Sequence, residues 1–174
     1  MSISPHLLVR RILQSSRRGT AAIEMAMLLL PFAMVLVGVF EVGIHVGRYA
    51  ILQDAVKTAS RLITTGQITS SDKVKFLNSI SQNTYGIIDA NTLSVFVNAY
   101  DSFSAIPVAF QTAFNSSGNA SNQSFQTGTG NQVVVVRVSY WYSFETPLVS
   151  SLFSSSSSSS SIFTTTLVFR NEPF

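Results

Sequence analysis

The chain has 174 residues, of which 46% are hydrophobic and only 11% are charged. Ordinary soluble domains carry about 25% charged residues, so this composition disfavours both a freely soluble protein and an acidic disordered one. The chain contains no cysteine, which excludes a disulfide framework, an iron–sulfur cluster and a cysteine nucleophile.

Positive charge is concentrated at the N-terminus. Residues 1–19 contain four arginines and no acid, whereas residues 20–174 contain seven basic and eight acidic residues. A nucleic-acid-binding protein would spread its basic residues over a folded face, so we expect no nucleic-acid partner. A basic cluster directly before an apolar run is typical of the cytoplasmic end of a membrane helix. We therefore predict a basic cytoplasmic leader over residues 1–19, whose side chains orient the chain in the membrane: Arg10, Arg11, Arg17 and Arg18.

An apolar run follows the leader. Met25–Phe40 contains no charged residue, and the apolar character extends on both sides, interrupted by Glu24, Glu41 and His45. About 20 helical residues span the hydrocarbon layer of a bilayer. The sequence therefore predicts a transmembrane segment at about residues 22–44, with everything after Arg48 outside the cytoplasm.

A cleavable secretory signal is the alternative to this anchor, but no Ala-x-Ala site follows the apolar run. Instead, helical periodicity continues beyond it, with apolar residues at 3-4-3-4 spacing on one face: Tyr49, Leu52, Val56, Ala59 and Ile63. Gly66 is placed to end the helix. We predict one long helix over residues 20–66, with a transmembrane half and an amphipathic half.

Glu24 is an unusual residue for an apolar segment. It either lies at the membrane interface in the first turn of the helix, or it has an assembly role. If the chain is cut after Gly19, Thr20 becomes the new N-terminus and Glu24 the fifth residue of the mature chain. The carboxylate could then pair with the free α-amine of a neighbouring subunit.

The segment Arg17-Arg18-Gly19-Thr20-Ala21-Ala22-Ile23-Glu24, followed by Met25–Phe40, resembles the leader and cleavage region of type IV prepilins. More narrowly, the chain resembles TadE-like pseudopilins of the tight-adherence (Tad/Flp) pilus system. Further stretches fit that family: Phe40–Gly43, Leu52–Arg61, Thr65-Gly66 and Arg170–Phe174. The resemblance implies cleavage by a prepilin peptidase between Gly19 and Thr20. It also implies partners among pilin subunits, the inner-membrane assembly machinery and lipid.

Two departures from the pilin pattern narrow the resemblance. Thr20 would be the first mature residue, where many type IV pilins carry a methylated aromatic residue, and Met25 follows Glu24 where major Flp pilins typically have tyrosine. These features, together with the chain length, favour a minor pilin or pseudopilin.

Other polar or small residues of the helix are candidates for assembly contacts. Gly43 and Gly47 form a Gly-x-x-x-Gly pair that would let two helices approach closely, although glycine is also common in membrane helices by chance. Glu41 and His45 share a helix face, where they could hydrogen-bond to each other or lie in headgroup water. No third or fourth ligand lies nearby, so no metal site is expected.

Residues 67–174, called the outer domain below, have the pattern of an extracytoplasmic α+β domain. A short helix starts at Ser70–Asp72, with Val74, Leu77 and Ile80 as its apolar face. Strands are expected over Leu93–Tyr100, Val133–Phe144 and Ile162–Phe169, and short connections favour antiparallel pairing. The strand Val133–Phe144 has one wholly apolar face that should pack on the amphipathic helix. The polar stretches 101–132 and 150–161 are predicted to be flexible loops.

The expected fold is therefore α+β and pilin-like, with the long helix packed on a small antiparallel sheet. Residues 49–174 contain neither His nor Cys, so no Ser–His–Asp triad and no Cys–His pair can form there. We expect no enzyme, no catalytic residue and no cofactor.

The first functional hypothesis is a minor pilin or pseudopilin that takes part in assembly or priming of a Tad-type adhesive pilus. It would reside in the bacterial inner membrane as a single-pass protein, with its outer domain in the periplasm, before any incorporation into the pilus. The alternative is a permanently anchored bitopic envelope protein with a periplasmic binding or scaffold domain. A membrane-bound hydrolase is a third, remote class.

Overall fold

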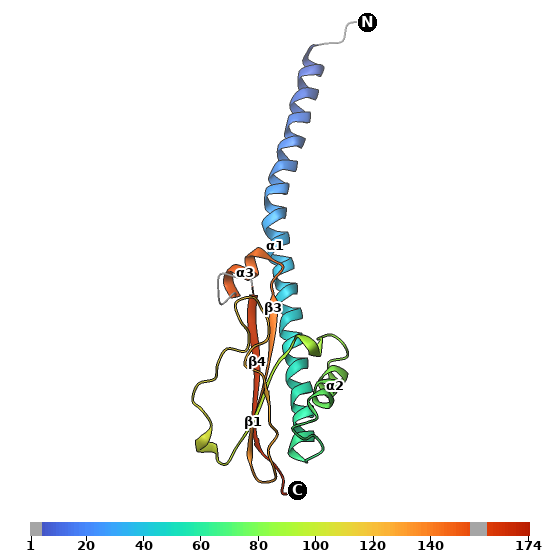
Figure 1. The fold of residues 1–174 in the computed structure, drawn as a ribbon. Coiled ribbons are helices and arrows are strands. Elements are labelled where there is room, and N and C mark those ends of the chain that lie inside the picture. Colours follow the sequence, from blue (N-terminus) through green and yellow to red (C-terminus); the bar gives the residue numbers. More distant parts are fainter. Residues whose placement is uncertain (1–4, 154–159) are drawn as a thin grey trace.

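The structure, a computed structural model, describes residues 5–153 and 160–174. It consists of one long helix, α1 (Pro5–Thr64), whose C-terminal part lies along a small sheet while its N-terminal part extends beyond the rest of the chain (Figure 1). The N- and C-termini therefore lie at opposite ends of the molecule. This is the expected α+β arrangement of a long helix on a small sheet.

The amphipathic half of α1 forms the centre of the hydrophobic core. Four residues of the predicted 3-4 face are completely buried, namely Leu52, Val56, Ala59 and Ile63, and so is Ala55, which the prediction did not include. Burying a large aliphatic side chain contributes about 1.5 to 3 kcal/mol, so Leu52, Val56 and Ile63 stabilise the packing of the helix on the sheet. Tyr49 extends the same face, and its hydroxyl donates to the carbonyl of Thr164 at 3.3 Å.

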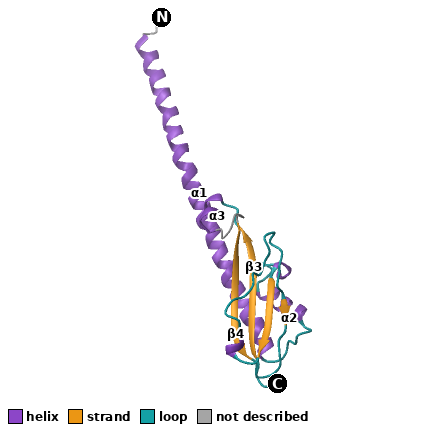
Figure 2. Cartoon of the chain, turned by 60° about the vertical axis from the view of Figure 1, so that its left-hand side comes forward, coloured by secondary structure: helices purple, strands orange, loops and turns teal. Residues whose placement is uncertain are grey.

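The sheet has four strands in the order β2-β1-β3-β4. The three long strands, β1 (Ser94–Tyr100), β3 (Val133–Ser143) and β4 (Ser160–Arg170), are antiparallel. Their side chains alternate between two faces. One face of β3, with Val134, Val136 and Val138, packs on α1 as predicted. In Figure 2 the sheet lies in front of the helices that cover this face.

The sheet is mixed, not purely antiparallel. The two-residue strand β2 (Ser124–Phe125) pairs with β1 in the parallel direction. Sequence analysis expected no strand here and assigned residues 101–132 to a loop, whereas the three strands that it did expect are antiparallel, as predicted. The chain from Asp101 to Gln123 is long enough to return along the sheet and present β2 in the same direction as β1.

Helix α2 (Lys73–Asn83) packs beside α1 on the same face of the sheet. It starts close to the predicted position, but its buried face consists of Phe76 and Ile80. Val74, which the sequence analysis assigned to that face, is 68% exposed. Its buried face therefore begins two positions later than expected, and Phe76 is the largest fully buried side chain of the core.

The segment between β1 and β3 crosses the opposite face of the sheet. It contains the short 3-10 helix η2 (Phe103–Ala105) and has two aromatic anchors that sequence analysis did not identify. Phe110 lies 5.7 Å from Phe96 of β1, and Phe114 lies 5.7 Å from Trp141 of β3, between ring centroids. The sheet is thus covered on both faces.

Two short helices flank the long strands. A second 3-10 helix, η1 (Ala90–Thr92), leads into β1, and a short helix, α3 (Pro147–Phe153), follows β3 beside α1. Of the predicted loop 150–161, residues 150–153 belong to α3 and residues 160–161 to β4. The remainder of that loop, residues 154–159, lies outside the described residues.

The C-terminal tail packs against the end of α1. Gly66 has a φ of +71°, and its N–H and that of Gln67 bond to the carbonyls of Ile63 and Leu62, which is a Schellman helix end. The N–H of Glu172 donates to the carbonyl of Thr64 at 3.0 Å, so the tail crosses the helix end. The predicted helix-ending role of Gly66 is confirmed.

Candidate assembly helix and its junction with the outer domain

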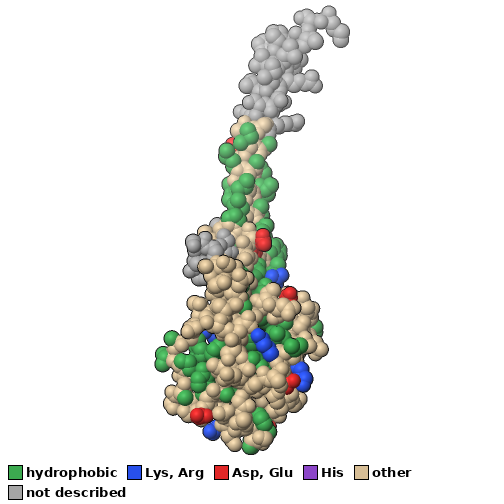
Figure 3. Space-filling view, viewed as in Figure 1, with side chains coloured by type: hydrophobic (Ala, Val, Ile, Leu, Met, Phe, Trp, Pro, Cys, Tyr) green, Lys and Arg blue, Asp and Glu red, His purple; other side chains and the backbone are tan. Residues whose placement is uncertain are grey.

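The N-terminal part of helix α1 projects from the outer domain, and the apolar side chains along it are not covered by other described residues. Every residue from Gly19 to Val37 is exposed, including Ile23, Met27 and Phe32 at 60%, 72% and 61%. Figure 3 shows apolar side chains along the visible side of the projecting helix. By length and composition, Gly19–Thr64 is able to cross a membrane. We call the exposed stretch Gly19–Val37 the bare helix.

Glu24 lies within the bare helix. It is exposed, and within the described residues it forms no salt bridge. Its neighbours in the chain, Ile23 and Met25, are 60% and 64% exposed apolar side chains. In the part of the chain whose side chains are described, the Glu24 carboxylate is therefore open to contact with another molecule.

The predicted processing site is also on this helix. Gly19 and Thr20 lie inside α1, which already begins at Pro5, instead of at the start of the helix. The side chains of the orienting arginines, Arg10, Arg11, Arg17 and Arg18, lie outside the part of the chain whose side chains are described. Their role stays a prediction.

Gly43 and Gly47 lie on a face of α1 that points away from the outer domain. A Cβ atom placed on either glycine would meet nothing within 4 Å. Both are exposed, as are Val39 and Val46 beside them at 65% and 59%. The Gly-x-x-x-Gly pair is therefore accessible to a second helix.

Glu41 lies where α1 first enters the outer domain, and it is only 7% exposed. Its carboxylate accepts hydrogen bonds from the backbone N–H of Glu145 at 2.6 Å and of Thr146 at 3.1 Å. The Thr146 hydroxyl also bonds to it. Glu41 was predicted to face a neighbouring subunit or headgroup water, whereas its oxygens are engaged within its own chain, at the start of α3.

His45, one turn further along, lies in an aromatic cage. Its ring centroid is 3.9 Å from that of Phe163, 4.3 Å from Tyr142 and 5.6 Å from Phe144. Neither ring nitrogen has a hydrogen-bond partner among the described residues, so the possible Glu41–His45 hydrogen bond is not formed. Burial lowers the pKa of His45, and the nearby charge of Arg48 lowers it further, while Glu41 acts in the opposite direction.

The junction consists of Glu41, His45 and the residues that enclose them. Sequence reasoning missed its other half, because backbone N–H groups of Glu145 and Thr146 supply the hydrogen bonds. One signal was available: threonine followed by Pro147 is a common helix start, and an anion is stabilised near such a start. Within the described part of the chain, no group of three or more His, Cys, Asp or Glu side chains could hold a metal ion.

Comparison with known proteins bears on this helix directly. The family model for TadE-like proteins matches residues 19–61. Over these residues the chain is similar to TadE-like proteins. The TadE-like segment contains the bare helix with Glu24, the two glycines, Glu41 and His45, and most of the buried face of α1. No curated protein and no solved structure matches the chain.

The family match covers residues 19–61, which is less than half of the chain. Among the described residues, one helix near the N-terminus is long and apolar enough to cross a membrane, which fits a single-pass anchor. The match ends at Arg61, so it does not extend into the outer domain, where the structure alone describes the surface.

Proposed function

We propose that this chain is a minor pilin or pseudopilin that takes part in assembly or priming of a Tad-type adhesive pilus. The observation that supports the proposal is the bare helix, an uncovered apolar rod with one exposed carboxylate, inside the TadE-like segment. Such a surface needs lipid or other helices around it, because an exposed apolar patch of this extent is unfavourable in water. The protein acts by assembly and has no catalytic role.

Glu24 supplies specificity to this packing. A carboxylate in the centre of a bilayer is unfavourable by about 2.5 to 3.5 kcal/mol on insertion scales, and by less near an interface. After cleavage between Gly19 and Thr20 by a prepilin peptidase, the free amine of one subunit would pair with Glu24 of the next. The pair neutralises two charges that lipid disfavours separately. The accessible Gly43–Gly47 face would allow close helix approach in the same bundle.

Before assembly, the chain would reside in the bacterial inner membrane, with its arginines in the cytoplasm and its outer domain in the periplasm. Gly38 and Glu41 are already covered by the outer domain. A transmembrane segment at about residues 22–44 would therefore bring α3 to the periplasmic surface of the inner membrane. The exposed side chain of Leu152, at 71%, is suited to that position.

Identification of the mature N-terminus tests the processing step. Mass spectrometry of the protein from membranes and from sheared pili should find chains that begin at Thr20. Peptides from membranes that continue through Gly19 into Thr20, with no chain beginning at Thr20 in either fraction, would contradict processing.

Substitution of Glu24 tests the pairing. Glu24→Gln keeps the size of the side chain and removes its charge, so we expect normal membrane insertion but loss of the subunit from sheared pili. Asp54→Asn is the matched control, because Asp54 is an exposed acid on the same helix and outside the predicted membrane segment. Equal incorporation of Glu24→Gln and Asp54→Asn would contradict the pairing role.

A permanently anchored envelope protein with a periplasmic binding domain is the second candidate. A cavity of about 360 Å³ on the outer face of the sheet favours it, since this is within the range of small-molecule sites. An uncleaved N-terminus, together with normal piliation by Glu24→Gln, would favour this candidate over the first.

A further inference from the structure

The cavity lies on the face of the sheet that is turned away from α1. Two adjacent cross-strand pairs form its floor: Phe96 of β1 opposite Arg137 of β3, and Ser94 opposite Ser139. These pairs are two residues apart on each strand, so their four side chains project from the same face of the sheet. Regular secondary structure therefore holds the floor.

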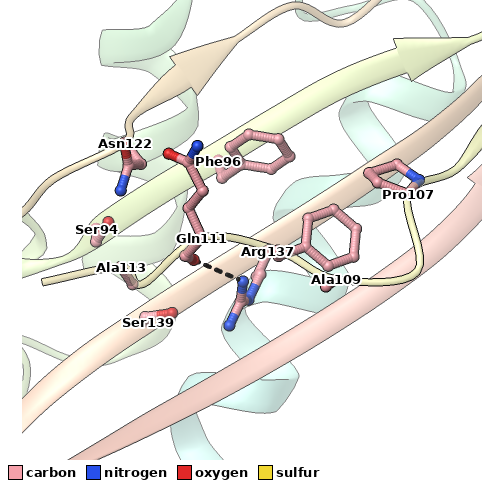
Figure 4. Close-up of a pocket in the computed structure, with 10 residues that line it drawn as sticks. Ser94, Phe96, Pro107, Ala109, Gln111, Ala113, Asn122, Arg137 and Ser139 are labelled. Carbon is pink, nitrogen blue, oxygen red and sulfur yellow. Dashed lines mark hydrogen bonds between the residues drawn. The ribbon is translucent and has the colours of Figure 1, made fainter.

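The roof is the segment from Pro107 to Ala113, joined by Asn122 (Figure 4). Several interactions fix its position. Phe110 packs edge-on against Phe96, and the amide of Asn122 donates to the carbonyl of Thr112 at 2.9 Å. The Ser94 hydroxyl donates to the carbonyl of Ser121 at 3.3 Å. The cavity is thus built by two layers, a strand floor and an anchored loop.

Arg137 is the one charged side chain that lines the cavity. Its guanidinium lies 5.3 Å from the centroid of the Phe110 ring and donates one hydrogen bond, at 3.2 Å, to the carbonyl of Gln111. Among the residues that the structure describes, it forms no salt bridge. A guanidinium has five N–H donors, arranged to bind a carboxylate through two of them. The cavity therefore offers a cation without a counter-ion.

The other walls suit a flat or apolar body. Phe96, Phe110 and Pro107 contribute apolar surface. The polar side chains on the floor are already bonded within the chain, since the Ser139 hydroxyl lies 2.8 Å from that of Thr164. A ligand would therefore gain most from one negative group on Arg137 and a ring that packs on the apolar surface of Phe96, Phe110 and Pro107.

We propose that this cavity binds a small molecule with one carboxylate on a six-membered ring, with Arg137 as the carboxylate-binding residue. The ring has two possible sources, an aromatic acid or an acidic sugar. Both share the carboxylate that Arg137 recognises, and the experiment separates them. The proposal concerns the outer domain alone and is independent of cleavage, Glu24 and pilus assembly.

The test uses the full chain in a polyoxyethylene detergent, whose headgroup carries neither a carboxylate nor a sugar. Trp141 is the only tryptophan and contacts Phe114, next to the cavity residue Ala113, so its fluorescence reports on the roof. Benzoate is titrated against benzamide, and glucuronate against glucose. We expect a saturable change, with a Kd below about 10 mM, for at least one acid and not for its neutral partner.

Two variants identify the site. Arg137→Gln should weaken binding of that acid by about tenfold or more, because it removes a charge-assisted hydrogen bond. Arg61→Gln removes the same charge from an exposed position on α1 and should leave binding unchanged. Ala113→Leu fills the cavity and retains Arg137. It should abolish binding of the acid, while the protein remains folded at the temperature of the titration.

Several results would overturn the proposal. They are the absence of a saturable change with both acids, equal binding of an acid and its neutral partner, and equal weakening by Arg61→Gln and Arg137→Gln. A further contradicting result combines the two variants. If Arg137→Gln lowers the unfolding temperature, and Ala113→Leu binds the acid as tightly as the unsubstituted protein does, then Arg137 only anchors the loop and the proposal fails.

Discussion

The carboxylate of Glu41 accepts a 2.6 Å hydrogen bond from the backbone N–H of Glu145, which is 104 positions later in the chain. The N–H of Thr146 donates to the other carboxylate oxygen at 3.1 Å. This contact joins α1 to the segment between β3 and α3 at the point where the bare helix leaves the outer domain. It therefore fixes the direction in which the apolar rod projects from the sheet.

Removal of the Glu41 charge should loosen this junction. In Glu41→Gln one acceptor oxygen is replaced by an NH₂ group that faces a backbone N–H donor. We expect a loss of about 1.5 to 3 kcal/mol in the free energy of unfolding, the range for hydrogen bonds to charged groups. Urea unfolding of the detergent-solubilised chain, followed by Trp141 fluorescence, measures it. Asp54→Asn, an exposed acid of the same helix, should change it by less than about 0.5 kcal/mol. Similar losses in both variants would contradict a specific junction.

The caged His45 predicts a pH dependence of stability. Burial lowers its pKa in the folded chain below the ordinary value of 6.5, so below that pH the unfolded chain binds more protons than the folded chain. Stability should therefore be constant above about pH 7 and fall as the pH decreases from there to 5.5. The groups that face the ring are Glu41, Arg48 and Tyr142, none of which has an ordinary pKa in this interval.

His45→Phe is the matched variant for this prediction, because phenylalanine retains the ring contacts and does not titrate. Unfolding midpoints of both proteins are measured between pH 7.5 and 5.5. The only other histidine, His6, is present in both chains, so its contribution cancels. The decline should be absent or clearly smaller in His45→Phe. Parallel curves would show that His45 does not control the pH dependence.

Sequence periodicity predicted those parts of the fold in which one element buries one face. The spacing from Leu52 to Ile63 and the alternation in β3 report burial directly, because helices repeat every 3.6 residues and strands every two. By contrast, β2, the aromatic anchors of the loop and the Glu41 junction depend on contacts between residues far apart in sequence. For the cavity, one signal was available: Arg137 is the only charged residue of an 11-residue strand.

Helix α2 allows a comparison between the predicted and the observed core residue. Phe76 is completely buried, and Phe76→Ala should lower the free energy of unfolding by about 3 to 5 kcal/mol. Val74, two positions earlier, is 68% exposed, and Val74→Ala should change it by no more than about 0.5 kcal/mol. Urea unfolding of both variants decides between them. A larger loss in Val74→Ala would mean that α2 packs through its other face.

Gly66 and Gly86 provide a matched pair for the contact between the tail and the end of α1. Their φ angles are +71° and +72°, so alanine meets a similar backbone cost of about 1 to 2 kcal/mol at either position. Only at Gly66 does the added Cβ meet another group, the ring of Phe174 at 2.8 Å, whereas nothing lies within 4 Å at Gly86.

Gly66→Ala should therefore destabilise the chain more than Gly86→Ala, by about 1 kcal/mol. The excess lies at the low end for overpacking because the Phe174 side chain is 62% exposed and has room to move. In a Phe174→Ala background the two glycine substitutions should become equal, since the clash is then removed. Urea unfolding of the four single and double variants, with the unsubstituted chain and Phe174→Ala as references, measures the excess. If it persists without the Phe174 ring, the tail does not pack on the helix end as described, and the extra cost at Gly66 arises from the Schellman turn itself.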